Sequence, residues 1–415
     1  MAAAASSRRP VRIGVIGVGN MGSCHVNWLL EGKVAGAICT AICDRDTDKL
    51  AQWSEGDKRP EADKRPEADK KLKHFTDSKA LIRSGLVDAV IIATPHFDHT
   101  TIGIDALEQG LHVMAEKPLS VHKSDCEKLI SAYKKRPKKS QLFAAMFNQR
   151  TDPKYLKLRE LIQSGELGEI RRVNWIITDW YRTQAYYTSG GWRATYKGEG
   201  GGVLSNQCPH NLDLLQWIFG MPKTVRGHIG IGKWHDIEVE DSMTAYLEYA
   251  NGATGVFITT TGEFPGTNRL EVTGDRGKVI AENGKLTFIR TTQSVHEHCM
   301  TTSVAWSTPE TWNIDIPIHG IGDQHVGILN NFSAAIRDGV PLIAQAVDGI
   351  HSVELGNAMV LSSLADKTLS LPLDTKFVDR EYKKLIASSK YEEKQNKAAK
   401  APKTKSGDFS TSFAK

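Results

Sequence analysis

The chain has 415 residues, of which 40% are hydrophobic and 24% charged, as expected for a globular protein of about two domains. The formal net charge is only +5, and much of the excess lies in residues 376–415, so basicity gives little support for nucleic-acid binding. The six cysteines have no CxxC or zinc-ligand spacing, and no apolar stretch reaches membrane-spanning length, so we expect a cytoplasmic protein without a membrane partner.

Strand and helix patterns alternate through the first 150 residues. This order is typical of a parallel sheet with crossover helices, so we predict an α/β fold with a Rossmann domain over residues 1–150. Five apolar strands are expected, at 12–17, 37–43, 88–94, 112–116 and 141–147. Within residues 57–70 the hexapeptide DKRPEA occurs twice and begins again. Such a polar tract cannot bury a face, and we interpret it as a surface insertion rather than a tether for a partner.

The pattern changes near residue 151, and we predict a second domain over residues 151–375. Its expected elements are a helix ending near residue 165, a strand at 170–180, and helices at 203–219, 326–337 and 352–364. Asn251-Gly252, Asn283-Gly284 and residues 274–277 each separate two β-type runs, so the strands between these helices should be antiparallel. The Lys-rich residues 376–415 are expected to form a flexible, solvated tail.

A glycine pattern of the form GxGxxG directly follows the first predicted strand and opens a helix. It consists of Gly17, Gly19 and Gly22, with Asn20 and Met21 before the last glycine. In this context the first glycine permits a tight turn, and the second lets the backbone approach a pyrophosphate. The N-terminus of the helix would then face the phosphates.

Asp44 ends the second predicted strand, where a carboxylate can accept hydrogen bonds from both ribose hydroxyls and would repel a 2′-phosphate. The cofactor predicted from this position is NAD. Arg45 follows directly and could contact a 2′-phosphate, so NADP remains the less favoured alternative. A capping role after the strand is the other interpretation of Asp44.

Two further strand ends carry polar groups at the edge where ligands of open parallel sheets bind. The residues expected to border the cofactor there are Thr94, Pro95, His96, His99, Glu116 and Lys117. A lysine beside a substrate hydroxyl can donate a hydrogen bond and relay the proton while hydride leaves the adjacent carbon. A lone lysine at a strand end is otherwise a solvated surface charge.

The second catalytic candidate lies in residues 200–213, GGGVLSNQCPHNLD. If this segment is helical throughout, Asn206, His210 and Asp213 share one face, although Pro209 makes a first turn irregular. A neutral histidine can take the proton of an alcohol as the alcohol is oxidised. The alternative interpretation is a hydrogen-bonded histidine of the core.

With the glycine loop, Glu-Lys-Pro and Gly-Gly-Gly…His-x-x-Asp in this order, the chain resembles the Gfo/Idh/MocA oxidoreductases over about residues 11–373. The resemblance implies a C-terminal domain with a large, mostly antiparallel open sheet, and a dimer or tetramer of identical chains. It places the catalytic lysine on Lys117 and the catalytic histidine on His210. Many members have Asp four residues before the histidine, whereas this chain has Asn206, which cannot act as a base but can hydrogen-bond a substrate hydroxyl.

By the same resemblance, Asn148 and Arg150 occupy the segment where an asparagine and an arginine approach the nicotinamide and the substrate. The aromatic loop before the glycines, which carries Trp192 and Arg193, would cover the open side of the cleft. Aromatic rings pack on the apolar face of a sugar, although such residues are also common in dimer contacts. The predicted substrate-binding residues are Lys117, Arg150, Trp192, Arg193, Asn206 and His210. No metal site is expected, since His296 and His298 have no third ligand in view.

Three functions remain open at this point. The favoured one is an NAD-dependent dehydrogenase that acts on a secondary hydroxyl of a sugar, glycoside or cyclitol, with His210 and Lys117 moving the proton. The alternative is an NAD-retaining glycosidase that oxidises transiently, eliminates, hydrates and reduces again, which the substitution at Asn206 keeps open. A non-enzymatic sensor ranks last, because both catalytic candidates are present.

Overall fold

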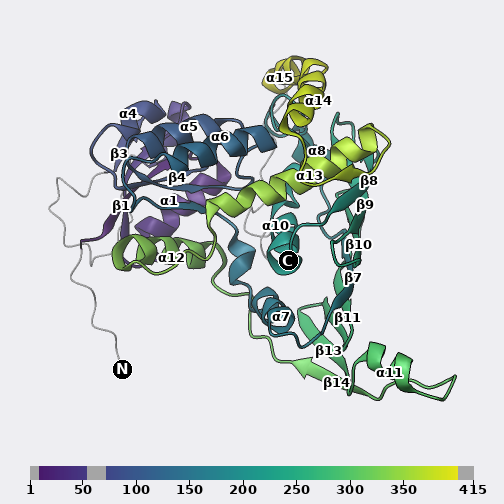
Figure 1. Cartoon of the computed structure of the whole chain (residues 1–415). Helices are drawn as coiled ribbons and strands as arrows, with labels where there is room; N and C mark the ends of the chain where they lie inside the picture. Colours follow the sequence, from purple (N-terminus) through teal and green to yellow (C-terminus); the bar gives the residue numbers. More distant parts are fainter. Residues whose placement is uncertain (1–8, 54–71, 401–415) are drawn as a thin grey trace.

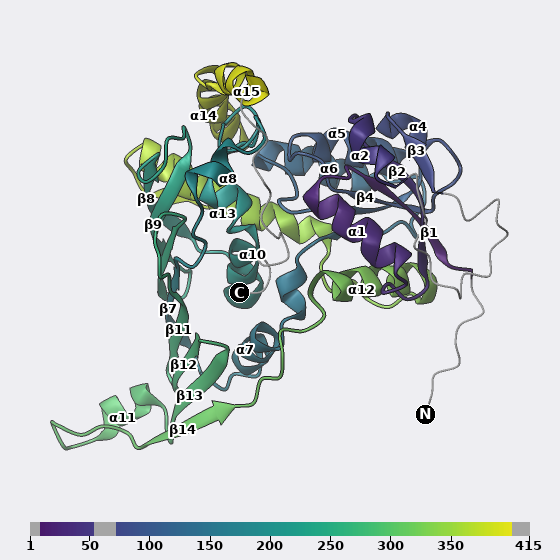
Figure 2. The same cartoon turned by 180° about the vertical axis from the view of Figure 1, so that it is seen from behind.

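The computed structural model describes residues 9–53 and 72–400, which form two sheets with helices packed between and around them (Figures 1 and 2). The repeat at 57–70 and residues 401–415 lie outside the described part. Among the described residues, no helix is both long and apolar enough to cross a membrane.

The first sheet is parallel and has six strands in the order β3-β2-β1-β4-β5-β6. Its strands are β1 (Val11–Ile16), β2 (Ala37–Cys43), β3 (Lys73–Phe75), β4 (Ala89–Ile92), β5 (His112–Ala115) and β6 (Phe143–Ala145). All five predicted strands are present, and β4 and β6 are shorter than expected. The strand order reverses between β1 and β4, and the crevice at such a switch point is where open α/β sheets bind ligands.

Helices cover both faces of this sheet (Figure 1). One face carries α4 (Ser78–Ile82), α5 (Asp98–Glu108) and α6 (Lys123–Lys134), the other carries α1 (Asn20–Leu30) and α12 (Gln324–Asp338), and α2 (Thr47–Ala51) follows β2. Ile328, Leu329 and Phe332 of α12 belong to the core of this first domain, and Ser333 Oγ donates to the carbonyl of Ala35 at 2.8 Å. Helix α12, which falls within the second domain predicted over residues 151–375, therefore packs with the Rossmann domain.

The second sheet has nine strands in the order β14-β13-β12-β11-β7-β10-β9-β8-β15, all antiparallel to their neighbours except for the parallel pair β7 and β10. The strands are β7 (Ile170–Ile177), β8 (Thr224–Ile231), β9 (Glu240–Glu248), β10 (Thr254–Thr260), β11 (Asn268–Gly274), β12 (Gly277–Glu282), β13 (Lys285–Thr291), β14 (Thr311–Ile316) and β15 (Leu369–Ser370). The three predicted turns join β9 to β10, β11 to β12 and β12 to β13, which confirms the expected antiparallel pairing.

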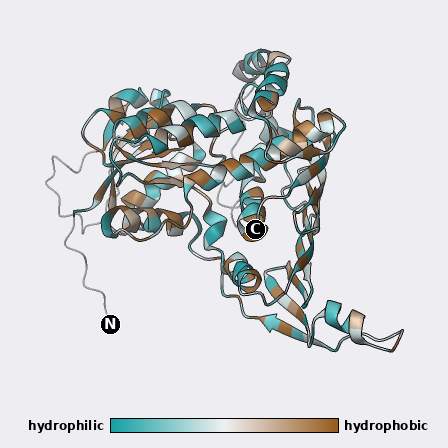
Figure 3. Ribbon diagram, in the orientation of Figure 1, coloured by the Kyte–Doolittle hydropathy of each residue, from teal (hydrophilic) through white to brown (hydrophobic). Residues whose placement is uncertain are grey.

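Three helices lie between the second sheet and the first domain: α7 (Pro153–Gln163), α10 (Pro209–Phe219) and α13 (Gly349–Leu364) (Figure 1). Helix α13 contacts α10 and β8 on one side and α6 on the other, so it connects the two domains. Its residues from Ser352 to Ser362 are buried throughout, and Figure 3 shows apolar residues along much of its length. This helix is hydrophobic all round because both domains pack on it.

Two expectations about helices are wrong. The helix predicted at 203–219 is broken into α9 (Val203–Asn206) and α10, because Pro209 lacks the N–H that a continuous helix would need. The segment expected to be a flexible tail forms α14 (Thr375–Ala387) and α15 (Tyr391–Lys400). Val378 and Tyr382 of α14 are buried, so an apolar stripe among the lysines anchors this helix.

Candidate active site

The glycines of the loop between β1 and α1 allow neighbouring backbone segments to pack closely together. A Cβ on Gly17 would lie 2.7 Å from the backbone of Ala93, and a Cβ on Gly22 would lie 1.7 Å from the carbonyl oxygen of Gly17. Gly17 also has a φ of 89°, whereas an added Cβ at Gly19 would meet nothing within 4 Å. No described side chain caps the N-terminus of α1 at Gly19, so its N–H groups can receive a phosphate.

Asp44 stands beside this loop at the end of β2. Its Oδ2 accepts the N–H of Val18 at 3.0 Å, and its Oδ1 accepts the N–H of Asp46 at 3.0 Å. Each carboxylate oxygen has a further lone pair for a ribose hydroxyl. The side chain of Arg45 is 86% exposed and lies 3.9 Å from Asp98. A tight glycine cradle, an uncapped helix and a carboxylate at the ribose position together fit NAD.

The ends of β4 and β5 are joined by a buried histidine. Nδ1 of His99 lies 2.9 Å from the carbonyl oxygen of Pro118, and Nε2 lies 2.9 Å from that of Thr94, which precedes Pro95. A neutral imidazole can donate only one of these two bonds. These contacts give His99 a role in holding the two strand ends together.

Lys117 follows β5, and its Nζ donates to the backbone carbonyl of Asn206 at 2.7 Å. Burial lowers the pKa of Lys117, while Glu116 and Glu199 oppose this effect. Glu116 itself is held by His25, whose Nε2 lies 2.7 Å from its Oε1. Burial alone would raise the pKa of Glu116, but the hydrogen bond and charge of His25, with weaker charges nearby, lower it to about 2. Lys117 therefore directly follows an ionised carboxylate, and its backbone N–H donates to that carboxylate at 3.2 Å.

His210 lies in the first turn of α10 and is 7% exposed. Burial and then the charge of Lys117 hold the pKa of His210 well below its ordinary value. Its Nδ1 is buried without a hydrogen-bond partner among the described residues. The charge of Lys117 acts on His210, so the two predicted catalytic residues lie near each other, and burial disfavours the charged form of both.

Glu199 is a residue of this site that the sequence did not reveal. It is 2% exposed, its Oε2 accepts the N–H of Ala194 at 2.6 Å, and its Oε1 accepts a hydrogen bond from the side chain of Asn206. Burial raises the pKa of Glu199. Asn206 therefore connects this carboxylate to Lys117, through its side chain on one side and its backbone carbonyl on the other. The available signal was a glutamate directly before the glycine run.

The helix that presents Asn206 is fixed by the second sheet. Oε1 of Glu240, on β9, accepts the N–H groups of Gly202 and Leu204 at 2.9 and 3.1 Å and so caps α9. Burial raises the pKa of Glu240 to about 7. The carbonyl that holds Lys117 is thus positioned by a residue of the second domain.

Arg150 occupies a different place from the one that the resemblance implied. Its side chain is 1% exposed, and its Nε and Nη2 donate to both oxygens of Asp213 at 2.7 and 2.6 Å. Its Nη1 lies 3.0 Å from Asp348. The break before Pro209 places Asn206 on α9, apart from His210 and Asp213 on α10, so the expected continuous helix face of all three residues does not form. These contacts favour a structural role for Arg150, and its role in substrate binding stays a prediction.

Asn148 and the aromatic loop contact different partners. Nδ2 of Asn148 donates to Gln324 at 2.7 Å, while its Oδ1 is buried without a described partner and can accept from a carboxamide. The ring of Trp192 lies 5.8 Å from that of His96, whose Nδ1 is 3.1 Å from the carbonyl of Glu199. Nη1 of Arg193 donates to the hydroxyl of Tyr186, on α8 (Gln184–Thr188), at 2.8 Å.

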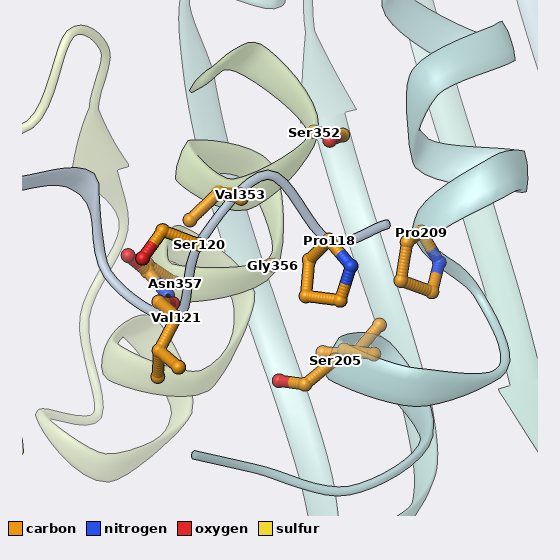
Figure 4. A pocket seen from close by; sticks show the side chains of 10 residues that line it. Pro118, Ser120, Val121, Ser205, Pro209, Ser352, Val353, Gly356 and Asn357 are labelled. Atoms are coloured by element: carbon orange, nitrogen blue, oxygen red, sulfur yellow. Dashed lines mark hydrogen bonds between the residues drawn. The ribbon is translucent and has the colours of Figure 1, made fainter. Parts of the chain in front are cut away.

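A small cavity of about 10 Å³ lies beside the two segments that carry Lys117 and His210. It is lined by the prolines that follow Lys117 and precede His210 and by residues of α13, among them Gly356 (Figure 4). This space holds about one water molecule. This cavity is a small gap between packed segments and is too small to hold a sugar. Among the described residues, no group of three histidine, cysteine or acidic side chains could hold a metal ion, and His296 and His298 lie on a helix, α11 (Val295–Thr301).

Two sequence models of one family match the chain and together cover more than half of it. Residues 11–143 match the oxidoreductase family with an NAD-binding Rossmann fold, and residues 155–280 match the GFO/IDH/MocA C-terminal domain. The chain belongs to the GFO/IDH/MocA oxidoreductase family. Membership in this NAD-binding family agrees with the glycine cradle and with the sheet order of the first domain, and the predicted family is confirmed.

Known GFO/IDH/MocA proteins resemble the chain over most of its length. The myo-inositol 2-dehydrogenase of Thermotoga maritima is 27% identical over 290 residues, which cover 67% of this chain and 77% of the relative. The WlbA dehydrogenase from Bordetella pertussis, solved with NADH and UDP-GlcNAcA, gives a TM-score of 0.70 at 23% identity and covers 88% of this chain and 100% of that one. Levoglucosan dehydrogenase, solved with NADH and levoglucosan, gives a TM-score of 0.70 at 20% identity with the same coverage.

Proposed function

We propose that the protein oxidises a secondary hydroxyl of a sugar, glycoside or cyclitol, with NAD as the hydride acceptor. The observation that carries the proposal is the meeting of Lys117 and a neutral His210 at the edge of the nucleotide domain. The family of the chain supports it, as do relatives named as inositol 2-dehydrogenase and a structural neighbour named levoglucosan dehydrogenase.

In this mechanism the nicotinamide supplies a hydride acceptor when NAD is bound. His210 is the base that takes the hydroxyl proton, because its depressed pKa keeps the ring neutral at physiological pH. The ammonium group of Lys117 is held by the Asn206 carbonyl and donates a further hydrogen bond to the substrate oxygen. Trp192 would pack on the apolar face of the sugar and help to exclude water.

The test is NADH absorbance with NAD and a panel of inositols, hexoses and glycosides, together with chromatography of the products. Steady NADH formation supports the dehydrogenase, whereas sugar release without NADH contradicts it in favour of the NAD-retaining glycosidase. Lys117→Ala should abolish turnover while NAD binding, followed by fluorescence quenching, stays nearly unchanged, because the glycine loop and Asp44 hold the nucleotide. A fully active variant would exclude Lys117 as the catalytic lysine.

We also propose a homo-oligomer in a reducing compartment such as the cytoplasm. Large apolar side chains remain exposed on and beside the second sheet, among them Trp306 at 97%, Phe264 at 73% and Met300 at 71%. Exposed apolar surface of this kind marks contact sites. All six cysteines are free, as a reducing compartment maintains them. Sedimentation velocity would test the assembly, and a 45.8 kDa species at micromolar concentration would contradict it.

A further inference from the structure

Two arginines converge on one tyrosine ring beside the catalytic lysine. The guanidinium carbon of Arg193 lies 4.7 Å from the centres of both the Tyr186 and Trp192 rings, and that of Arg182 lies 5.3 Å from the centre of Tyr186. Both arginines are close enough to Lys117 to lower its pKa, after the larger effect of burial. Three cationic side chains therefore share one part of the cleft.

The carboxylates of this region are already engaged. Glu116 is hydrogen-bonded to His25 and to the backbone N–H of Lys117. Glu199 accepts from Ala194 and from Asn206, and its nearest approach to Arg193 is 4.0 Å. Two carboxylates therefore face three basic side chains: Glu116 and Glu199 both favour the charged form of Lys117, and Glu199 reaches Arg193 only at 4.0 Å, which is beyond hydrogen-bond distance.

The guanidinium group of Arg193 is held in place, but among the described residues it has no carboxylate within hydrogen-bond distance. Its side chain is 17% exposed; its Nη1 donates to the Tyr186 hydroxyl at 2.8 Å and lies 4.0 Å from Glu199. Stacking between two aromatic rings fixes its plane, which suits a fork of N–H donors that holds an anionic group with two hydrogen bonds. Trp192, which stacks on Arg193, also contacts His96 at the cofactor edge. The fork therefore borders the place where a sugar would lie.

We infer that Arg193, supported by Arg182, forms a subsite for an anionic group, and that the substrate is an acidic sugar such as a hexuronate. This inference rests on the proposed oxidation of a sugar hydroxyl. A pyranuronate carries its carboxylate across the ring from its C2 and C3 hydroxyls, so one molecule can place the anion at Arg193 and a hydroxyl between Lys117 and His210. A sugar phosphate offers the same charge to the same donors.

The test compares methyl glucuronide with methyl glucoside, which share a ring and differ in the charged group. Binding to the enzyme with NADH is measured by calorimetry, and oxidation with NAD by kcat/KM; glucose 6-phosphate forms a third arm. We expect the glucuronide to bind at least tenfold more tightly than the glucoside. Arg193→Gln should weaken glucuronide binding about 10- to 100-fold, the usual effect of losing a charged hydrogen bond, and glucoside binding less than threefold. Arg290→Gln, on β13, is the matched control.

Equal or tighter binding of the glucoside, or an equal loss for both ligands in Arg193→Gln, would overturn the inference. Tighter binding of glucose 6-phosphate, lost in the same variant, supports the anionic subsite and identifies phosphate as the group. Binding of the glucuronide without NADH formation from any sugar would leave the subsite in place and refute the proposed oxidation. NADH formation from neutral sugars alone would support the proposed oxidation and refute the anionic subsite.

Discussion

Removal of Arg150 should destabilise the protein severely rather than weaken substrate binding alone. In Arg150→Met the carboxylate of Asp213, which is 1% exposed, loses both of its guanidinium hydrogen bonds. Breaking a buried pair from one side costs about 3–5 kcal/mol, because the remaining charge is uncompensated. The second pair adds less, about 0–1 kcal/mol, since the side chain of Asp348 is 38% exposed and screened by solvent. Stacking on Trp217 at 5.2 Å contributes about 1 kcal/mol more.

The loss should depend on pH in a defined direction. Burial already raises the pKa of Asp213 in the folded protein, and removal of Arg150 should raise it further. A carboxyl with a raised pKa in the folded state is tolerated at low pH, where it is neutral, and costs stability as the pH rises through that pKa. Arg150→Met should therefore fall further below the wild type at pH 8 than at pH 5. Equilibrium unfolding in urea, followed by fluorescence, measures both differences.

A double variant separates a structural role from a role in substrate binding. Arg150→Met with Asp213→Leu removes both charges and should recover most of the lost stability, since apolar replacements of buried pairs are often neutral. KM is then measured in this folded protein. A loss below 1 kcal/mol in the single variant, combined with a tenfold rise of KM in the double variant, would refute the structural role and restore Arg150 as a substrate-binding residue.

Three further predictions concern the site and its support. The acid limb of kcat/KM should lie well below pH 6.5, because the depressed pKa of His210 keeps it neutral there; a limb at or above 6.5 in a pH-rate profile would exclude it as the base. Gly22→Ala should abolish NAD binding in calorimetry or prevent folding, since its Cβ would lie 1.7 Å from a carbonyl oxygen, and a variant with wild-type affinity would contradict the packing. Glu240→Gln should keep the cap of α9 and lose less than 1 kcal/mol, whereas Glu240→Leu should lose about 1–3 kcal/mol and most of the turnover; equal stability of the two would refute the cap.

The sequence predicted the first domain well because its signals are local. Each strand is a short apolar run, and the glycine loop is defined by spacing alone. The hairpins of the second sheet could also be predicted from the sequence, because an Asn-Gly pair favours a tight hairpin turn. The pairing of β7 with β10 could not be predicted in this way, because it joins strands that are far apart in the chain and have no turn between them.

The site was predicted in part, for a related reason. Lys117 and His210 stand in motifs, so their proximity followed from the order of the motifs. Glu199 and Arg150 do not stand in motifs, and their roles depend on burial and on partners 5 to 198 residues away. The sequence does not distinguish a buried arginine from a solvated one, because the carboxylate that pairs with the buried arginine is brought to it only by the tertiary structure.

The hydrogen bond that anchors Lys117 makes the folding of the site depend on both domains. The lysine belongs to the nucleotide-binding domain, but the carbonyl that holds it belongs to α9, and α9 is capped from β9 of the other sheet. A fragment that ends after β6 would contain the glycine loop and Asp44, but it would lack both the anchor of its lysine and α12, which completes the core of the first domain. The first domain can therefore complete its core only after residues 324–338 have been synthesised, and Lys117 reaches its anchored position only after residue 240 has joined its sheet. The position of Lys117 in the first domain therefore depends on the folding of the second domain.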